Sequence, residues 1–403
     1  MKLRASALCY ALAAILALPA SALAAAQLTV YGNNNNEPYT EAASGVGSNS
    51  GTWEWDGPEG DLRLNGYDGG FIEASGGGDL NVVISGENVI STENNWTDLD
   101  GALSPGALHC SNGSISISGE EGATLTVAME TNLPCPNYSA IRTSGSGGDR
   151  NVVIDGVDVT ATMDNNYVDN DDGWIAIFGY SGGVVAVGDV IVTNGGSLTA
   201  SLEQSGFEGW HEARAGVYSW GGVRVEEGSS LSASSNSHIG VTAASLAVTD
   251  STLDASGPIA AVAMSNADPT SILIDGSSYV ASPEGAVPTA IELGLWRFKM
   301  SGTAWTVMAV PDSEGDPVPV TELSIRIPEP EPTPVPDPQP KPEPDPEPEP
   351  APEPEPEPNP APKPAPAPTA LPKTADAALL AEACISASGA LCALAAGIRR
   401  RRG

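Results

Sequence analysis

Apolar and polar residues alternate in short runs through most of this chain. Examples are Ser114–Ile117, Gly122–Val127 and Ser245–Val248, in which Ile, Leu, Val or Ala takes every second position. Gly, Asn and Asp separate these runs, and no stretch of ten residues has an apolar face at helical spacing. Alternation with a period of two places one face of each strand toward a core. The pattern predicts an all-β body built from many short strands.

The same pattern returns along the chain. Residues 77–86 match residues 147–156 at eight of ten positions, with an offset of 70. A shorter unit at 107–127 recurs at 216–233, and partial copies follow it. One such unit cannot bury its apolar side alone, so copies must stack. We therefore expect a right-handed parallel β-helix solenoid over residues 27–327. The alternative, an array of β-sandwiches, is disfavoured by the changing spacer lengths, because a solenoid accepts insertions at its corners.

Both ends of the chain carry targeting signals. Lys2 and Arg4 precede an apolar core, and small residues follow, so residues 1–26 are typical of a secretory signal peptide. At the other end, the run 377–398 is apolar and would span about 33 Å as a helix. Four arginines within 399–403 mark the cytoplasmic side of this predicted transmembrane segment.

A proline-rich segment separates the body from this anchor. From Pro328 to Pro368 every second residue is proline, with mainly Glu, Asp and Ala between. Such a sequence favours an extended polyproline II rod of about 125 Å. We assign residues 328–370 as a spacer that reaches through a thick cell wall. A disordered linker without a spacing role is the alternative.

Residues 371–376 stand between the spacer and the apolar run. The order Leu371-Pro372-Lys373-Thr374-Ala375, apolar span and basic tail resembles the cell-wall sorting signal of Gram-positive surface proteins. The resemblance implies cleavage between Thr374 and Ala375 by a sortase and attachment to peptidoglycan. The family has Gly where this chain has Ala375, so the alternative is an uncleaved membrane anchor. Either reading places the body at the cell surface, with the C-terminal helix in the membrane before processing.

The body carries a second resemblance. Its opening segments, Trp53–Asp56, Leu62–Tyr67 and Gly86–Ile90, are similar to β-helical modules of secreted Gram-positive proteins, which are carbohydrate-binding or pectin-lyase-like. The likeness implies the fold more strongly than an activity. The chain has 51 acidic and 17 basic residues, a net charge of −34, which excludes nucleic acid as a partner. In the exported body, Cys110 and Cys135 either form a disulfide or are two small core residues.

Motifs for catalysis are incomplete. His211-Glu212 would open a zinc-protease helix, but Ala215 stands where the second histidine is required. Residues 179–183 match a nucleophile elbow without its strand–turn–helix setting, and we interpret them, with the related residues 218–222, as a repeated corner. The segments expected of polygalacturonase-like enzymes are absent. We predict a protein that is not an enzyme, with a β-helical polysaccharide lyase or hydrolase as the alternative.

Two loops of similar sequence offer hard oxygen ligands. Calcium is the candidate cofactor, because carboxylates at alternate positions suit it. The candidate ligands are Asp98 and Asp100 in the first loop and Asp169, Asp171 and Asp172 in the second. The alternative is that these residues only form turns at solenoid corners.

Aromatic residues near the same loops suggest a ligand. Aromatic rings beside Asp and Asn bind sugars by stacking on the ring face and bonding the hydroxyls. The candidates are Trp96, Tyr167, Trp174, Trp210 and Trp220. The alternative is that these rings cover coil ends. We therefore expect adhesion, through a polysaccharide or a host-surface ligand, and a passive surface spacer is the competing class.

Overall fold

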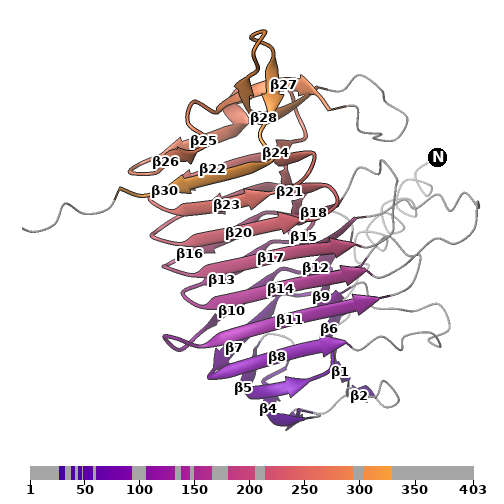
Figure 1. Ribbon diagram of the computed structural model, residues 1–403. Helices are drawn as coiled ribbons and strands as arrows, with labels where there is room; N and C mark the ends of the chain where they lie inside the picture. The colour runs from indigo at the N-terminus through magenta and orange to yellow at the C-terminus, as the bar shows by residue number, and fades with distance from the viewer. Residues whose placement is uncertain are drawn as a thin grey trace, which may run out of the picture. The chain divides into compact units, whose positions relative to one another are not determined.

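Stacked parallel strands make up the body of this computed structural model (Figure 1). The structure describes residues 27–31, 38–40, 44–47, 49–57, 60–92, 106–131, 138–145, 149–165, 180–204, 214–293 and 304–328. The predicted signal peptide, most of the proline-rich spacer, the sorting motif and the apolar run 377–398 lie outside these ranges. Among the described residues, no helix is long and apolar enough to cross a membrane.

Each coil consists of three strands, which we name the first, second and third legs. The first-leg strands are β7 (Leu80–Ser85), β10 (Ile115–Gly119), β13 (Val152–Asp155), β16 (Val190–Thr193), β19 (Gly222–Val225), β22 (Ser245–Thr249) and β25 (Ile272–Asp275). The second-leg strands are β8 (Glu87–Thr92), β11 (Thr124–Thr131), β14 (Asp158–Asn165), β17 (Ser197–Gln204), β20 (Ser230–Ser235) and β23 (Thr252–Ser256). The third-leg strands are β6 (Ile72–Ser75), β9 (Gly106–Ser111), β12 (Ser139–Ser144), β15 (Ser181–Ala186), β18 (Arg214–Ser219), β21 (Ile239–Ala243) and β24 (Ala260–Met264).

Strands of one leg pair in parallel with the same leg of the next coil. Ile115 lies between Leu80 and Val152, and Val152 in turn pairs with Val190. All four side chains point inward and are buried. Each inward position is thereby one ladder of aliphatic residues along the solenoid, and each backbone group bonds to the coil above or below. The expected all-β, parallel, solenoid-like architecture is confirmed for the described residues.

The structural register refines the sequence repeat. The segments 107–127 and 216–233 align as predicted, with Leu108 and Val217 on one third-leg ladder and Leu125 and Leu231 on one second-leg ladder. The match between residues 77–86 and 147–156 has another offset in the structure. Leu80 lies on the same ladder as Val152, so the structural offset is 72 residues, whereas the sequence match has an offset of 70. A shift of two residues leaves every side chain on the same face, so the sequence pattern cannot detect it.

Coil length varies at one corner. The register from Ile115 to Val152 spans 37 residues, whereas that from Val223 to Leu246 spans 23. Most of the difference lies between the second and third legs, where the long coils carry the segments 93–105, 132–137, 166–179 and 205–213. The short coils turn this corner within three residues, at 236–238 and 257–259. This corner carries the longest insertions, and the corner between the third and first legs varies less, from one residue at 244 to seven at 145–151 and 265–271.

The third leg approaches the second closely just after this corner. A Cβ on Gly183 would lie 2.5 Å from the Ala161 carbonyl oxygen, and one on Gly216 would lie 2.6 Å from the Ser234 amide nitrogen. The equivalent places in other coils are taken by alanines such as Ala140. Only small residues fit here, because the backbones of two legs meet without room for a larger side chain.

Antiparallel strands close both ends. At the start, β1 (Gln27–Tyr31) pairs with β6 and with β2 (Pro38–Thr40), while β4 (Ser50–Trp55) pairs with β3 (Ser44–Val46) and with β5 (Asp61–Gly69). At the other end, β27 (Val287–Glu292) and β29 (Pro317–Pro319) pair with β28 (Ala304–Pro311), which pairs with β24, and η1 covers Pro269–Ser271. The last strand, β30 (Glu322–Arg326), lies between β23 and β26 (Tyr279–Ser282). Reversed strands end the parallel stack.

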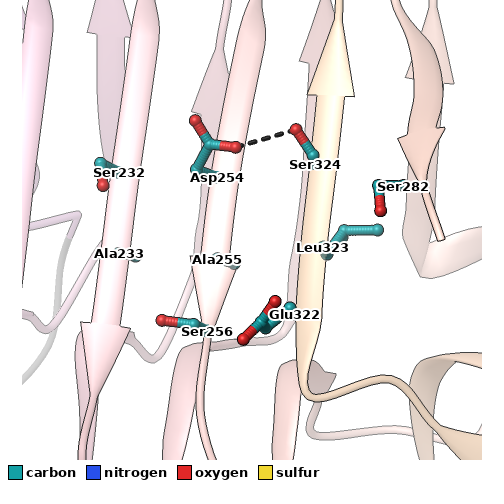
Figure 2. Close-up of a pocket in the computed structure, with 9 residues that line it drawn as sticks. All are labelled: Ser232, Ala233, Asp254, Ala255, Ser256, Ser282, Glu322, Leu323 and Ser324. Atoms are coloured by element: carbon teal, nitrogen blue, oxygen red, sulfur yellow. Dashed lines mark hydrogen bonds between the residues drawn. The ribbon is translucent and has the colours of Figure 1, made fainter.

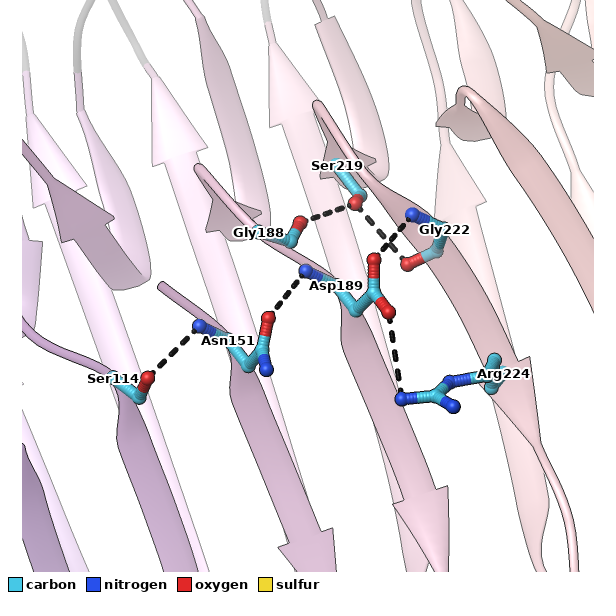
Figure 3. Close-up of polar contacts among 7 residues, drawn as sticks. All are labelled: Ser114, Asn151, Gly188, Asp189, Ser219, Gly222 and Arg224. Carbon is cyan, nitrogen blue, oxygen red and sulfur yellow. Dashed lines mark hydrogen bonds and ion pairs between the residues drawn. The ribbon is translucent and has the colours of Figure 1, made fainter. Parts of the chain in front are cut away.

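The corner that precedes the first leg holds a polar ladder (Figure 3). At each step a side-chain oxygen accepts the amide N–H of the equivalent residue in the next coil. The steps are Asp79 Oδ1 from Ser114 (2.8 Å), Ser114 Oγ from Asn151 (3.2 Å), Asn151 Oδ1 from Asp189 (2.8 Å) and Asp189 Oδ1 from Gly222 (2.7 Å). Amides at a bend have no strand partner, so this ladder satisfies them and fixes the register.

The ladder predicts the effect of two substitutions at Asp189. Asp189→Ala should lower the free energy of unfolding by about 1–3 kcal/mol, because the Gly222 amide loses its acceptor. Asp189→Asn keeps the Oδ1 acceptor, as Asn151 does one coil earlier, and should retain most of the stability. Both variants remove the same charge and the ion pair with Arg224 at 3.4 Å. Equal decreases in the free energy of unfolding of the two variants, measured by urea unfolding, would contradict this role of the ladder.

Candidate functional site

The long segments join the solenoid at one corner. Thr131, Asn165 and Gln204, which precede three of them, stand on one ladder at the end of the second leg. Ser181 and Arg214, which follow two of them, are paired at the start of the third leg. Their attachment points are therefore stacked on successive coils, at the edge of the third-leg sheet.

Most of the predicted site residues belong to these segments. They lie outside the described residues: Trp96, Asp98, Asp100, Tyr167, Asp169, Asp171, Asp172, Trp174 and Trp210. Among the residues that the structure describes, no three His, Cys, Asp or Glu side chains are grouped to hold a metal ion. The calcium site and these aromatic contacts remain predictions, and Trp220 alone of the aromatic candidates can be placed.

The outer face of the third leg gathers charged and aromatic side chains among the described residues. In β15 and β18 every residue is buried, whereas second-leg strands such as β14 and β17 alternate between buried and more exposed positions. One outward row runs across the sheet through Glu73, His109, Arg142, Val185, Tyr218, Thr242 and Ala263. The row begins with charged and polar residues, and from Val185 onward it is uncharged.

His109 lies at the charged end of the row and is 3% exposed. Its Nδ1 is 3.2 Å from Glu73 Oε1, and its Nε2 is 2.8 Å from Ser144 Oγ. A carboxylate on one ring nitrogen fixes the orientation of the imidazole. His109 is therefore held between two polar partners on the outer side of the sheet.

Two arginines follow on the same face. Arg142 donates from Nη1 to the Tyr180 carbonyl oxygen at 3.0 Å, and Arg214 donates to Gln204 Oε1 at 2.5 Å. Burial lowers the pKa of each guanidinium to about 10, so both stay protonated at neutral pH. Arg142 is 7% exposed and Arg214 is 3% exposed, so both guanidinium groups lie inside the protein and are bonded to it.

Three aromatic rings pack together beside the arginines. The ring centroids of Tyr180 and Trp220 are 4.1 Å apart, those of Tyr180 and Tyr218 are 4.7 Å apart, and those of Tyr218 and Trp220 are 4.9 Å apart. Val185 and Ala215 complete this aromatic cluster, which is separate from the main core. Tyr218 is buried, but Tyr180 and Trp220 are half-buried. The two partly exposed rings are supported from below and fixed in orientation.

The sequence pointed to Trp220 but not to the two tyrosines. Both had appeared in the segments 179–183 and 218–222, which we interpreted as one repeated corner. That interpretation is wrong, because Ser181 starts β15 opposite Arg214, whereas Ser219 ends β18 opposite Ala186. Ser219 instead donates to the Gly188 carbonyl oxygen at 2.7 Å (Figure 3). The alternation of apolar residues on the third leg was the signal that could have placed Tyr218.

Cys110 is a buried free thiol in the structure. Its Sγ donates to the Gly78 carbonyl oxygen at 3.5 Å, and burial raises the pKa of the thiol to about 11. Such a thiol is unreactive at neutral pH. Cys135 lies outside the described residues, so the disulfide between the two stays a prediction.

No protein-family model, curated protein or solved structure matches this chain.

Proposed function

We propose that this chain is an exported surface protein whose solenoid binds glycans at the outer face of the third leg. We infer a right-handed parallel β-helix, because parallel strands joined by crossovers in one sheet take that hand almost without exception. The signal peptide, the proline-rich spacer and the sorting motif support display from the cell wall. The acidic surface supports a ligand other than nucleic acid.

The aromatic cluster carries the proposal. A sugar ring has an apolar face that stacks on an aromatic ring and a rim of hydroxyls that bond to polar neighbours. Tyr180 and Trp220 offer such rings, and both are half-buried, so part of each ring remains accessible to a ligand. The points at which the long segments join the solenoid lie at the edge of this face.

A polysaccharide-degrading enzyme is the second candidate. The contact between His109 and Glu73 favours it, because a histidine held by a carboxylate is a common general base. Binding is preferred, because the described part of the face carries no second carboxylate in register with Glu73. Release of shortened sugars from a bound polysaccharide would favour the enzyme.

Replacement of Trp220 tests the binding site. Trp220→Ala should weaken the binding of an oligosaccharide at least tenfold, or about 1.4 kcal/mol, because one stacking surface is lost. The matched control is Tyr279→Ala, which removes an aromatic ring that is 48% exposed on β26, away from this face. Titration of a panel of soluble oligosaccharides with the full chain measures both affinities, and melting curves check that the variants are folded. Equal affinities for Trp220→Ala and the unmodified chain would contradict the site.

Attachment to the wall is tested at the sorting motif. We expect that chain released from native cells by a muramidase ends at Thr374 and carries a peptidoglycan fragment. Mass spectrometry of the C-terminal peptide measures this directly. Recovery of mature chain that still contains residues 383–398 would show that the segment is retained as a membrane anchor and would contradict sortase processing.

A further inference from the structure

The outer face of the second leg is a regular array of hydroxyl groups. Its central row occupies five successive coils in register, without a bulge between them. The row consists of Thr126, Thr160, Thr199, Ser232 and Asp254. All five side chains are exposed. Four of the five positions therefore present a hydroxyl to solvent at the same height on consecutive strands.

Rows on either side repeat this composition. One row consists of Thr124, Asp158, Ser197, Ser230 and Thr252, and the other of Ala128, Thr162, Ser201, Ser234 and Ser256. Four of the five positions in each row again carry a hydroxyl. Within the last row, Ser201 Oγ donates to Thr162 Oγ1 at 3.3 Å. We name these three rows the hydroxyl face. It contains no aromatic or basic side chain.

The hydroxyl face has two fixed spacings. Neighbouring coils are about 4.8 Å apart, and alternate residues along a strand are about 6.7 Å apart. The strands β11, β14, β17, β20 and β23 lie side by side in one layer (Figure 1). The hydroxyls thus form a two-dimensional lattice on a rigid surface.

This composition is not a general property of the solenoid exterior. The equivalent central row of the first leg consists of Ser116, Val153, Ile191, Arg224, Ala247 and Leu273. Those residues are also partly or largely exposed, yet Ser116 is the one hydroxyl among the six, and the others are apolar or charged. The strand preference for Thr acts on both legs. Strand preference therefore does not explain why the second leg carries more hydroxyls than the first.

The hydroxyl face ends in a depression of about 290 Å³ (Figure 2). Hydroxyls of Ser232, Ser256, Ser282 and Ser324 line it together with the carboxylates of Asp254 and Glu322. Asp254 accepts from Ser324 Oγ at 2.9 Å and from Arg326 Nη2 at 2.7 Å. These contacts fix the last strand, β30, and give the end of the face a set of rigid oxygen acceptors.

We propose that the hydroxyl face binds the flat surface of an ordered polysaccharide, with the polymer chains running along the solenoid axis. One pyranose ring of an extended chain is close in length to the height of one coil, so successive sugars meet successive hydroxyls. A single hydroxyl contact contributes little, because water competes for it. When the spacing of the hydroxyl face matches that of the polysaccharide surface, many such contacts form together without a further loss of conformational entropy. A flat face with little concavity is suited to a solid and not to a free oligosaccharide.

The charged positions favour a polysaccharide over ice, the other solid with repeating oxygen atoms. Asp158 and Asp254 replace hydroxyls within the lattice. Carboxylates accept hydrogen bonds from polymer hydroxyls, but they hold their own hydration water and would interrupt an ice-like layer. The hydroxyl face is also separate from the aromatic cluster, so the proposal for one surface can be wrong while the proposal for the other is right.

The test is the retention of the full chain on washed microcrystalline cellulose and crystalline chitin at high salt. The test variant is the triple change Thr126→Val, Thr160→Val and Thr199→Val, which removes three hydroxyls while keeping shape and strand preference. The matched control removes three first-leg hydroxyls through Ser116→Ala, Thr193→Val and Thr249→Val. We expect the unmodified chain and the control to be retained, and the triple valine variant to be retained at least tenfold less.

Three results would overturn the proposal. The first is no retention of the unmodified chain on either solid. The second is equal retention of the triple valine variant and its control, which would show nonspecific adsorption. The third is inhibition of ice growth that the triple valine variant loses, which would assign the hydroxyl face to ice. Melting curves of both variants, measured in parallel, ensure that a loss of retention reflects the missing hydroxyls.

Discussion

Every feature of this molecule depends on hydrogen bonding between coils in one parallel register. A coil with three short strands has no core of its own, so its apolar side chains are buried only by the coils above and below. The ladder of Ile115, Val152 and Val190 shows how the same inward position is filled in each coil. A slip of one residue at any coil would turn these side chains outward. The polar ladder through Asn151 and Asp189 opposes such a slip, because it bonds one particular residue to the next coil.

Once the register is fixed, the three legs become three different surfaces. The first leg carries a mixed exterior, the second carries the hydroxyl face, and the third carries the buried row with the aromatic cluster. Insertions enter at the corner between the second and third legs, so chain length can change there without disturbing the ladders. The solenoid is thus a rigid frame that brings side chains from distant parts of the sequence to one face. His109 and Tyr218, for example, lie on one outward row.

The sequence predicted much of the frame and little of the site. Alternation and repetition were enough to predict stacked parallel strands, because every coil repeats the same constraint. The offset of the match between residues 77–86 and 147–156 was wrong by two residues, since a shift of two preserves the facing of each side chain. Tyr180 was missed because it comes from the coil before Tyr218 and Trp220, and only the register brings its ring to theirs. The hydroxyl face escaped notice for the same reason, since Thr and Ser in strands have no distinctive local pattern.

The register itself can be measured by disulfide cross-linking between adjacent coils. Thr160 and Thr199 are partners on neighbouring coils, about 4.8 Å apart, which is within the range that a disulfide can bridge. Thr160 and Ser232 stand on the same row two coils apart, at about 9.6 Å, which is beyond that range. Under mild oxidation, the double variant Thr160→Cys with Thr199→Cys should cross-link nearly completely within one chain, and Thr160→Cys with Ser232→Cys should not. Cross-linking of the second pair but not the first would contradict the parallel register on which this account rests.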